Sequence, residues 1–177
     1  QRQMCIRDSP GYSEFNGQTF TMEGEGHDVG GTDDSFHFAY APMTGDGTIT
    51  ARVVRPMSSQ WTKPGVMMRE TLAADSRHAS VLLLPHWSGA LVTRSKKGGE
   101  TTTNKARHLG EKHVIKKNRL STPYWLRLIR FRNRFTGYMS ADGYNWKDLG
   151  SVEIPMAQTV YVGLPACSQL NKVTTTV

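Results

Sequence analysis

Hydrophobic and polar residues alternate along most of the chain, which is the pattern of strands that bury one face. In the segment 47–53, Ile49, Ala51 and Val53 are separated by threonine and arginine. Successive side chains of a strand point to opposite faces, so one face of such a segment can pack against a core while the other meets solvent. No convincing long stretch has the period of about 3.6 residues that marks an amphipathic helix. The pattern therefore predicts an all-β chain.

Further short runs of β-branched, aromatic or apolar residues lie at 80–85, 89–94, 124–131, 134–140 and 159–168. Glycine-rich and polar turn sequences separate them, as expected for strands joined by short connections. About a dozen strands at this spacing predict an antiparallel two-sheet sandwich of the jelly-roll kind. Residues that should be mostly buried are Ile49, Val53, Leu82, Leu84, Leu126, Leu128, Phe135, Val160, Val162 and Leu164.

The first nine residues, QRQMCIRDS, show neither the alternation of a strand nor the 3.6-residue period of a helix. Back-translation of residues 3–8 matches one reading frame of a transposon-end adapter used to prepare sequencing libraries, and a genuine disordered N-terminus is the alternative. Because foreign scars are excluded from fold reasoning, we interpret residues 1–9 as an adapter artefact outside the fold. We expect this segment to be unpaired and dispensable, and residues 10–177 to form one domain of ordinary size.

The net charge of +7 is concentrated in one segment, since residues 94–119 hold nine Lys and Arg residues against two Glu. This segment is either a solvated loop or a docking loop for an acidic or sulfated polysaccharide, with Lys112, Lys116, Lys117 and Arg119 as its binding cations. Nucleic acid is a poorer partner because no aromatic residues interleave with these cations to stack on bases. No apolar run approaches the ~18 residues of a membrane span.

Several stretches together resemble one family: GTDDSFHFAYAPMTGDGTITARV, WTKPGVMMRETLAADSRHASVLL, the run from PYWLRLIRF to YVGLPACS, and the final TTTV. Their order is similar to bacterial concanavalin A-like lectin/glucanase sandwiches, in particular to accessory modules of large secreted or surface proteins. The resemblance implies an extracellular, cell-surface or periplasmic location and neighbouring domains in a parent protein.

The chain departs from the family pattern at three places. Pro64 and Pro165 stand in strand motifs, where proline indicates an edge, a bulge or a strand start because it donates no ladder hydrogen bond. The family continues beyond TTTV through a closing strand, so we interpret the domain as truncated at its C-terminus.

Enzymes of this superfamily align carboxylates on one strand, and Glu23, Glu25 and Asp28 have a comparable spacing. They are interleaved with glycine and histidine, which provide no apolar setting to raise the pKa of an acid. Asp28, Asp33, Asp34 and Asp46 could offer oxygen ligands to calcium, but no dense carboxylate loop supports such a site. We therefore expect no cofactor and no enzymatic activity.

Aromatic plates beside polar groups are the usual recipe for a sugar site, although most tryptophans of a sandwich this size belong to its core. The predicted groove residues are Trp61, Arg69, His86, Trp87, Arg94 and Tyr138. Arg69 and Arg94 occupy strand positions where a charge is costly unless it is paired or faces a groove, and pairing of Arg69 with a carboxylate is the alternative. The chain is thus expected to be a non-catalytic carbohydrate- or surface-binding module. The alternatives are a structural packing domain and, less favoured, a glycoside hydrolase or lyase.

Overall fold

A computed structural model describes residues 2–6, 11–24, 26–54, 63–84, 88–105, 124–167 and 173–176. The described residues form strands joined by turns, and no helix occurs among them. In chain order the strands are β1 (Arg2–Ile6), β2 (Gly11–Phe15), β3 (Phe20–Gly24), β4 (Phe36–Thr44), β5 (Gly47–Val53), β6 (Gly65–Arg69), β7 (His78–Leu84), β8 (Ser88–Arg94), β9 (Thr102–Lys105), β10 (Tyr124–Phe131), β11 (Arg134–Ser140), β12 (Lys147–Glu153), β13 (Thr159–Ala166) and β14 (Val173–Thr176).

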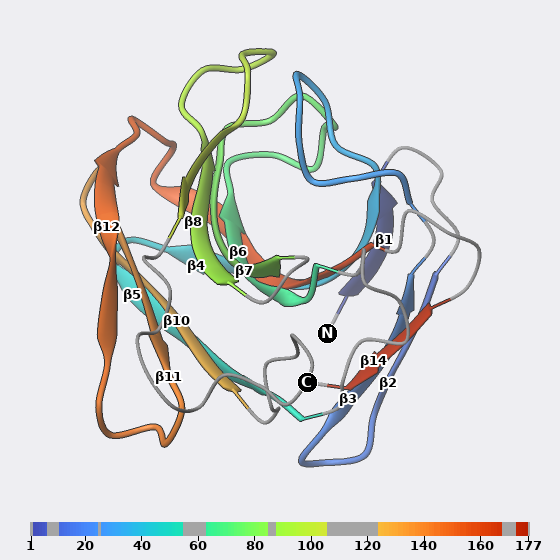
Figure 1. The fold of residues 1–177 in the computed structure, drawn as a ribbon. Coiled ribbons are helices and arrows are strands. Elements are labelled where there is room, and N and C mark those ends of the chain that lie inside the picture. Colours follow the sequence, from blue (N-terminus) through green and yellow to red (C-terminus); the bar gives the residue numbers. More distant parts are fainter. Residues whose placement is uncertain are drawn as a thin grey trace.

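The strands form three antiparallel sheets arranged in two layers. The seven-stranded sheet has the order β1-β4-β13-β6-β7-β8-β9 and is strongly curved (Figure 1). The four-stranded sheet β12-β11-β10-β5 and the three-stranded sheet β14-β3-β2 lie on the same side of it (Figure 1). The prediction of an all-β antiparallel sandwich is therefore confirmed.

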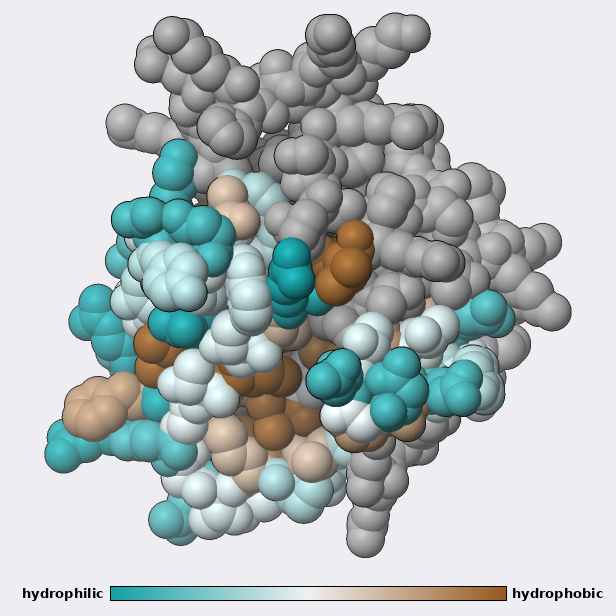
Figure 2. Space-filling view, turned by 90° about the horizontal axis from the view of Figure 1, so that it is seen from below, coloured by the Kyte–Doolittle hydropathy of each residue, from teal (hydrophilic) through white to brown (hydrophobic). Residues whose placement is uncertain are grey.

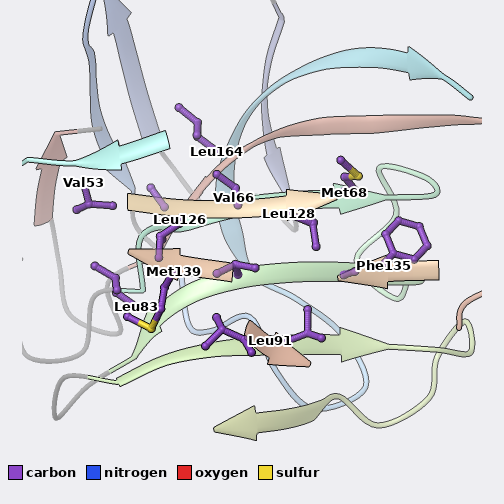
Figure 3. Packing of buried hydrophobic residues seen from close by; sticks show 14 of the residues in the cluster. Val53, Val66, Met68, Leu83, Leu91, Leu126, Leu128, Phe135, Met139 and Leu164 are labelled. Atoms are coloured by element: carbon purple, nitrogen blue, oxygen red, sulfur yellow. The ribbon is translucent and has the colours of Figure 1, made fainter. Parts of the chain in front are cut away.

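The main core lies between the seven-stranded sheet and the four-stranded sheet. Val66, Met68 and Leu91 of the larger sheet face Leu128 and Phe135 of the smaller one (Figure 3). These residues recur at every second position of their strands, as the sequence pattern predicts. Among the ten positions predicted to be buried, seven are buried, and the remaining three, Ile49, Leu84 and Val162, are partly buried.

The opposite face of the seven-stranded sheet is also buried. The rings of Phe36, Phe38, Tyr40 and Tyr161 form a chain of contacts, with neighbouring centroids 5.7, 5.5 and 5.3 Å apart. Met67 in the neighbouring strand packs into the same cluster. Both faces of this sheet therefore exclude water, which explains why β6 and β7 are apolar almost throughout rather than at alternate positions.

The N-terminal segment differs from its expected behaviour. Residues 2–6 form β1, which pairs with β4 from Arg2 opposite Tyr40 to Ile6 opposite Phe36. The expectation that residues 1–9 stay unpaired and outside the fold is thus wrong for residues 2–6. The physical reason is that ladder pairing uses backbone groups, so an exposed strand edge accepts almost any extended segment. The origin of these residues stays a prediction.

Both unusual prolines lie where a strand tolerates them. Pro64 directly precedes β6, so it marks a strand start. Pro165 lies within β13 and pairs with Phe38 on one side, while the pairing of β13 with β6 ends at Gly163 opposite Met67. The missing N–H of Pro165 therefore interrupts no described ladder on the β6 side. The predicted strand start is confirmed for Pro64. Pro165 instead lies near the end of β13, an inner strand whose register with β4 is continuous, so the prediction of an edge, a bulge or a strand start is wrong for this residue.

Candidate functional site

Of the residues predicted to form a binding groove, those that the structure describes do not all lie together. Trp61, His86 and Trp87 lie outside the described residues, as do the loop cations Lys112, Lys116, Lys117 and Arg119. Arg69 and Arg94 lie in β6 and β8 of the seven-stranded sheet. Tyr138 lies in β11 of the other layer and is half-buried. Its buried neighbours Gly137 and Met139 point inward, so Tyr138 belongs to the outer face of the four-stranded sheet and is not brought together with the two arginines.

Arg94 is a fully buried cation at the centre of a hydrogen-bond network. Its Nη2 and Nη1 atoms lie 2.8 and 2.9 Å from the two carboxylate oxygens of Asp34, which is also fully buried. The guanidinium group also donates to the backbone oxygens of Gly30, Gly31, Ala74, Ser76 and Gly99. Its donors are therefore used inside the protein, where they join three connecting loops to the end of β8.

Arg69 joins the same network from the neighbouring strand. Its Nη1 atom lies 3.3 Å from Asp34 Oδ2, and its Nε and Nη2 atoms donate to the carbonyl oxygens of Thr71 and Ala73 at 2.8 and 2.5 Å. Burial lowers the pKa of Arg69 to about 10, and the charge of Asp34 opposes this shift, so the group stays protonated near neutral pH. Arg69 is thus ion-paired with a carboxylate, the alternative stated for it above, and we assign both arginines to loop support.

His78 completes this buried cluster without adding a charge. Burial, and then the charges of Arg69 and Arg94, lower the pKa of His78 well below its ordinary value. The neutral ring lies 3.0 Å from the hydroxyl of Ser80 through its Nδ1 atom. Burial raises the pKa of the Asp34 carboxyl group, because it disfavours the charged form. The guanidinium groups of Arg94 and Arg69 lower this pKa and so oppose the effect of burial.

A cleft of about 760 Å³ opens between the four-stranded sheet and the tip of the β2–β3 hairpin. Figure 2 shows this side of the molecule from below, with hydrophobic residues in the middle of the face and hydrophilic residues on both sides. The lining comes from five parts of the fold: Gln18, Thr19 and Phe20; Ala39, Tyr40 and Ala41 of β4; Ile49, Thr50, Ala51, Arg52 and Val54 in or after β5; Trp125 of β10; and Val162, Gly163 and Leu164 of β13.

The alternation of β5 gives the cleft an apolar floor and a polar rim. Ile49 and Ala51 pack against the core, whereas Thr50 and Arg52 are exposed on the other face of the strand. Among the described strands β5 pairs only with β10, so its second edge faces the cleft. This edge makes backbone groups accessible as well as side chains.

The hairpin tip supplies the opposite rim of the cleft. The side-chain oxygen of Asn16 accepts hydrogen bonds from the backbone N–H groups of Gln18 and Thr19 at 3.1 and 2.9 Å. Gly17 has a φ of 98°, which residues with a Cβ rarely adopt. The sequence Asn-Gly therefore fixes a tight turn that places Gln18 and Thr19 at the cleft.

The cleft continues onto the outer face of the four-stranded sheet through a row of residues that we call the arginine–tryptophan strip: Arg52, Trp125, Arg127 and Trp146. Arg52 pairs in register with Trp125, and its guanidinium carbon lies 5.7 Å from the centre of that ring. The guanidinium carbon of Arg127 lies 3.8 Å from the centre of the Trp146 ring. Arg127 Nε donates to the hydroxyl of Thr50 at 3.0 Å. Tyr138 lies opposite Arg127 on the next strand and extends the strip.

A tight hairpin at residues 140–146 holds Trp146 in the strip. The carboxylate of Asp142 accepts hydrogen bonds from the N–H groups of Tyr144 and Asn145, the side-chain amide of Asn145 and the hydroxyl of Ser140. These bonds lower the pKa of Asp142 far below its ordinary value, and the bond from the Asn145 side chain contributes most to that shift. Trp146 Nε1 donates to Gly143 O at 3.0 Å, so the indole covers the turn.

Three of the carboxylates considered for catalysis or calcium, Asp28, Asp34 and Asp46, are used for structural contacts. Asp28 pairs with Lys63, Asp34 pairs with Arg94 and Arg69, and Asp46 accepts from the backbone N–H of Arg132. Another acid, Glu70, accepts from the N–H of Ala157 at 2.9 Å and lies 3.5 Å from Arg77. Glu25 is not among the described residues. Within the described ranges, no three His, Cys, Asp or Glu side chains are grouped closely enough to hold a metal ion.

Sequence reasoning did not identify Gln18, Thr50, Arg52 and Arg127 as site residues. A usable signal was present, because the alternation of YWLRLIRF places Trp125 and Arg127 on the outer face of β10. The cleft itself is built from segments far apart in the chain, so no local pattern indicates it.

No family model matches this sequence, and no curated protein sequence matches it. Solved structures do match. A protein of unknown function from Saccharomyces cerevisiae has a TM-score of 0.72 and 17% identity, covering 95% of this chain and 91% of the yeast chain.

A carbohydrate-binding module of family 66 from Bacillus subtilis has a TM-score of 0.57 and 13% identity, covering 98% of this chain and 91% of the module. A lectin from Bauhinia forficata, solved with N-acetylgalactosamine, has a TM-score of 0.50 and 7% identity, covering 99% and 94% of the two chains. These similarities establish that the chain has the concanavalin A-like fold. No helix within the described segments is both long and apolar enough to cross a bilayer.

Proposed function

We propose that the protein is a non-catalytic carbohydrate-binding module and that the cleft beside Trp125 holds the sugar chain. The fold is shared with a carbohydrate-binding module and a lectin, which supports the class of function without indicating the site. The observation that carries the proposal is the position of Trp125, a half-buried indole at the mouth of a 760 Å³ cleft.

The chemistry of the lining suits a sugar. An indole offers a flat apolar surface to the C–H face of a pyranose ring, and Thr19, Gln18 and Thr50 offer hydroxyl and amide groups to its hydroxyls. A ligand site of this kind needs a mostly apolar surface and a few polar groups that fix orientation. The apolar floor and polar rim of this cleft provide that combination.

The same lining supports binding rather than hydrolysis. Glycoside hydrolysis requires two carboxyl groups on either side of the scissile bond, about 5–10 Å apart. The described residues that line the cleft contribute amide, hydroxyl, guanidinium and apolar groups, and none of them is Asp or Glu. We accordingly propose a binding role, and an extracellular location within a larger protein, where polysaccharides are accessible.

The test is isothermal titration calorimetry with a panel of neutral and acidic oligosaccharides. Trp125→Ala should weaken binding by about tenfold or more, which corresponds to ~1.4 kcal/mol, the scale of a buried aromatic anchor. Tyr144→Ala is the matched control, because Tyr144 is an aromatic residue that is 89% exposed and does not line the cleft.

Loss of affinity in Trp125→Ala with an unchanged thermal transition supports the site. If the wild type binds no member of the panel, the chain is better described as a structural packing domain. If reducing ends appear during incubation with a polysaccharide, the protein is an enzyme and the non-catalytic assignment is wrong.

A further inference from the structure

We propose that the sugar recognised at this cleft is anionic, a uronic acid or a sulfate ester, and that Arg52 and Arg127 bind its charged group. The inference rests on the proposed carbohydrate-binding function and specifies the chemistry of its ligand. It uses residues of the described sandwich and is independent of the lysine-rich segment.

The two guanidinium groups belong to neighbouring strands on one face of the sheet. Arg52 lies opposite Trp125 and Thr50 lies opposite Arg127, so Arg52 and Arg127 occupy diagonal positions, two residues apart in register. Diagonal neighbours in an antiparallel pair are within reach of long side chains, and like charges on neighbouring strands repel. A ligand anion placed between them would remove that repulsion.

Neither of these arginines has a carboxylate partner among the described residues. Each is held by an aromatic ring: Arg52 by Trp125 at 5.7 Å and Arg127 by Trp146 at 3.8 Å. By contrast, Arg69 and Arg94 are paired with Asp34. An aromatic ring orients a guanidinium group without neutralising it, so the positive charge of the strip remains available to a ligand.

Two acids of the four-stranded sheet and its turns, Asp142 and Asp148, are engaged in hydrogen bonds within their own turns. Asp142 accepts its hydrogen bonds within the 140–146 hairpin. Asp148, which lies opposite Tyr138, accepts from the N–H of Gly150. Both carboxylates are therefore engaged by groups of their own turns, and neither forms a described ion pair with Arg52 or Arg127.

The remaining donors fit an oxyanion beside a sugar ring. The Nε atom of Arg127 is used by Thr50, which fixes the plane of the guanidinium and leaves its two Nη groups without a described hydrogen bond. Planar guanidinium groups bind carboxylates and sulfates through paired hydrogen bonds. A sugar ring bound beside Trp125 would therefore bring its charged substituent within reach of the Arg52 and Arg127 guanidinium groups.

The experiment compares three probes of similar length at low and moderate salt: an oligogalacturonate, a heparin-derived oligosaccharide and a neutral xylo-oligosaccharide. The variants are Arg52→Gln and Arg127→Gln. The control is Arg134→Gln, which removes one positive charge from an exposed residue of β11 whose Nη2 group donates to Ser151 at 3.3 Å. Thermal unfolding of each variant checks that the fold is kept, and Arg52→Gln is the safer test because Arg52 is exposed and has no described hydrogen bond.

We expect at least one acidic probe to bind at least about tenfold more tightly than the neutral probe, and Arg52→Gln and Arg127→Gln each to weaken acidic binding by about tenfold or more. Arg134→Gln should change the affinity for the acidic probes by less than about threefold. Preference for the uronate or the sulfated probe identifies the anion. Equal binding of neutral and acidic probes, or equal loss in Arg134→Gln, overturns the inference and leaves the proposed function intact. Absence of binding to all three probes, together with the wider panel, overturns both.

Discussion

Asp34 and Arg94, 60 residues apart in the chain, form a bidentate ion pair from which water is fully excluded. The carboxylate belongs to the loop before β4, and the guanidinium group belongs to the end of β8. Because Arg69 also reaches Asp34, one carboxylate compensates two buried cations. The loops that surround this pair are held by these side-chain contacts together with backbone hydrogen bonds between loops, such as that from the N–H of Asp34 to the carbonyl oxygen of Ala74 at 2.9 Å.

Replacing Asp34 with Asn should lower the free energy of unfolding by about 3–5 kcal/mol, since it leaves two buried guanidinium groups without a compensating charge. Urea unfolding measures the change. Lys97→Gln is the matched control, because it breaks the exposed Lys97–Asp75 pair, whose atoms lie 3.9 Å apart, and should cost no more than about 1 kcal/mol. Equal effects of the two substitutions would show that Asp34 contributes no more than a surface charge.

Gly163→Ala should destabilise the fold by about 1–3 kcal/mol, as expected for overpacking of a closely packed region. A Cβ at this position would overlap with the carbonyl oxygen of Ala39 and lie 2.8 Å from the Cα of Tyr40, both of them backbone atoms of the paired strand β4. Chemical unfolding checks this result. Ala41→Ser, a substitution at an exposed position of β4, should change the free energy of unfolding by no more than about 0.5 kcal/mol. A neutral Gly163→Ala would mean that β13 and β4 separate easily.

The turn around Asp142 should make stability depend on acid pH. Its hydrogen bonds hold the pKa of Asp142 in the folded state below the value of about 3.9 expected for the unfolded chain. The stabilisation is therefore present above about pH 4 and is lost as the pH falls through the folded-state pKa. In unfolding curves recorded between neutral pH and about pH 2, Asp142→Asn should flatten the decline in stability. A decline as steep as that of the wild type would contradict this account.

Cys167 should be unreactive in the folded protein. Burial raises its pKa to about 12, so at about pH 8 it carries on the order of a thousandfold less thiolate than an ordinary cysteine. The measurement is modification by a disulfide reagent in a Cys5→Ser background, with and without denaturant. Fast modification without denaturant would show that the region around Cys167 opens readily.

Deleting residues 1–9 should lower the thermal transition, because it removes the strand that pairs with β4 from Arg2 to Ile6. A loss of 1 kcal/mol shifts Tm by about 2–4 °C for a chain of this size, and we expect at least this shift. Met4→Ala retains the backbone pairing and should have a smaller effect. An unchanged Tm after deletion would instead support a foreign, dispensable segment.

The alternation of apolar and polar residues was enough to predict the sandwich. Each strand carries the pattern of its own buried face within a few consecutive residues, so a local pattern indicates it. The same pattern placed Arg69 and Arg94 correctly on strands but left their role open. Deciding between an ion pair and a groove required knowing that Asp34 lies beside both, which depends on how distant loops fold back. The turn chemistry of Asp142 and Gly143 was predictable, since every partner in it lies within a few residues.

The candidate site was less predictable for a related reason. Trp125 was one of several aromatic residues that could have belonged to the core, and only the register of β10 with β5 places Arg52 beside it. The cleft depends on the packing of a hairpin against another layer, which leaves no trace in a local sequence pattern. Pairing of residues 2–6 with β4 was missed because an edge strand selects its partner through backbone groups, whatever the side chains are.

The separation between the four-stranded and three-stranded sheets has a mechanical consequence. No described backbone ladder crosses the cleft, so its two walls are joined through side-chain packing, including that of Phe20 and Ile49 against the core. Packing contacts are short-ranged and can slide, whereas a hydrogen-bonded ladder breaks when it is stretched. The hairpin can therefore lean toward or away from β5 more easily than a strand paired with β5 could, so the width of the opening is not fixed by the backbone.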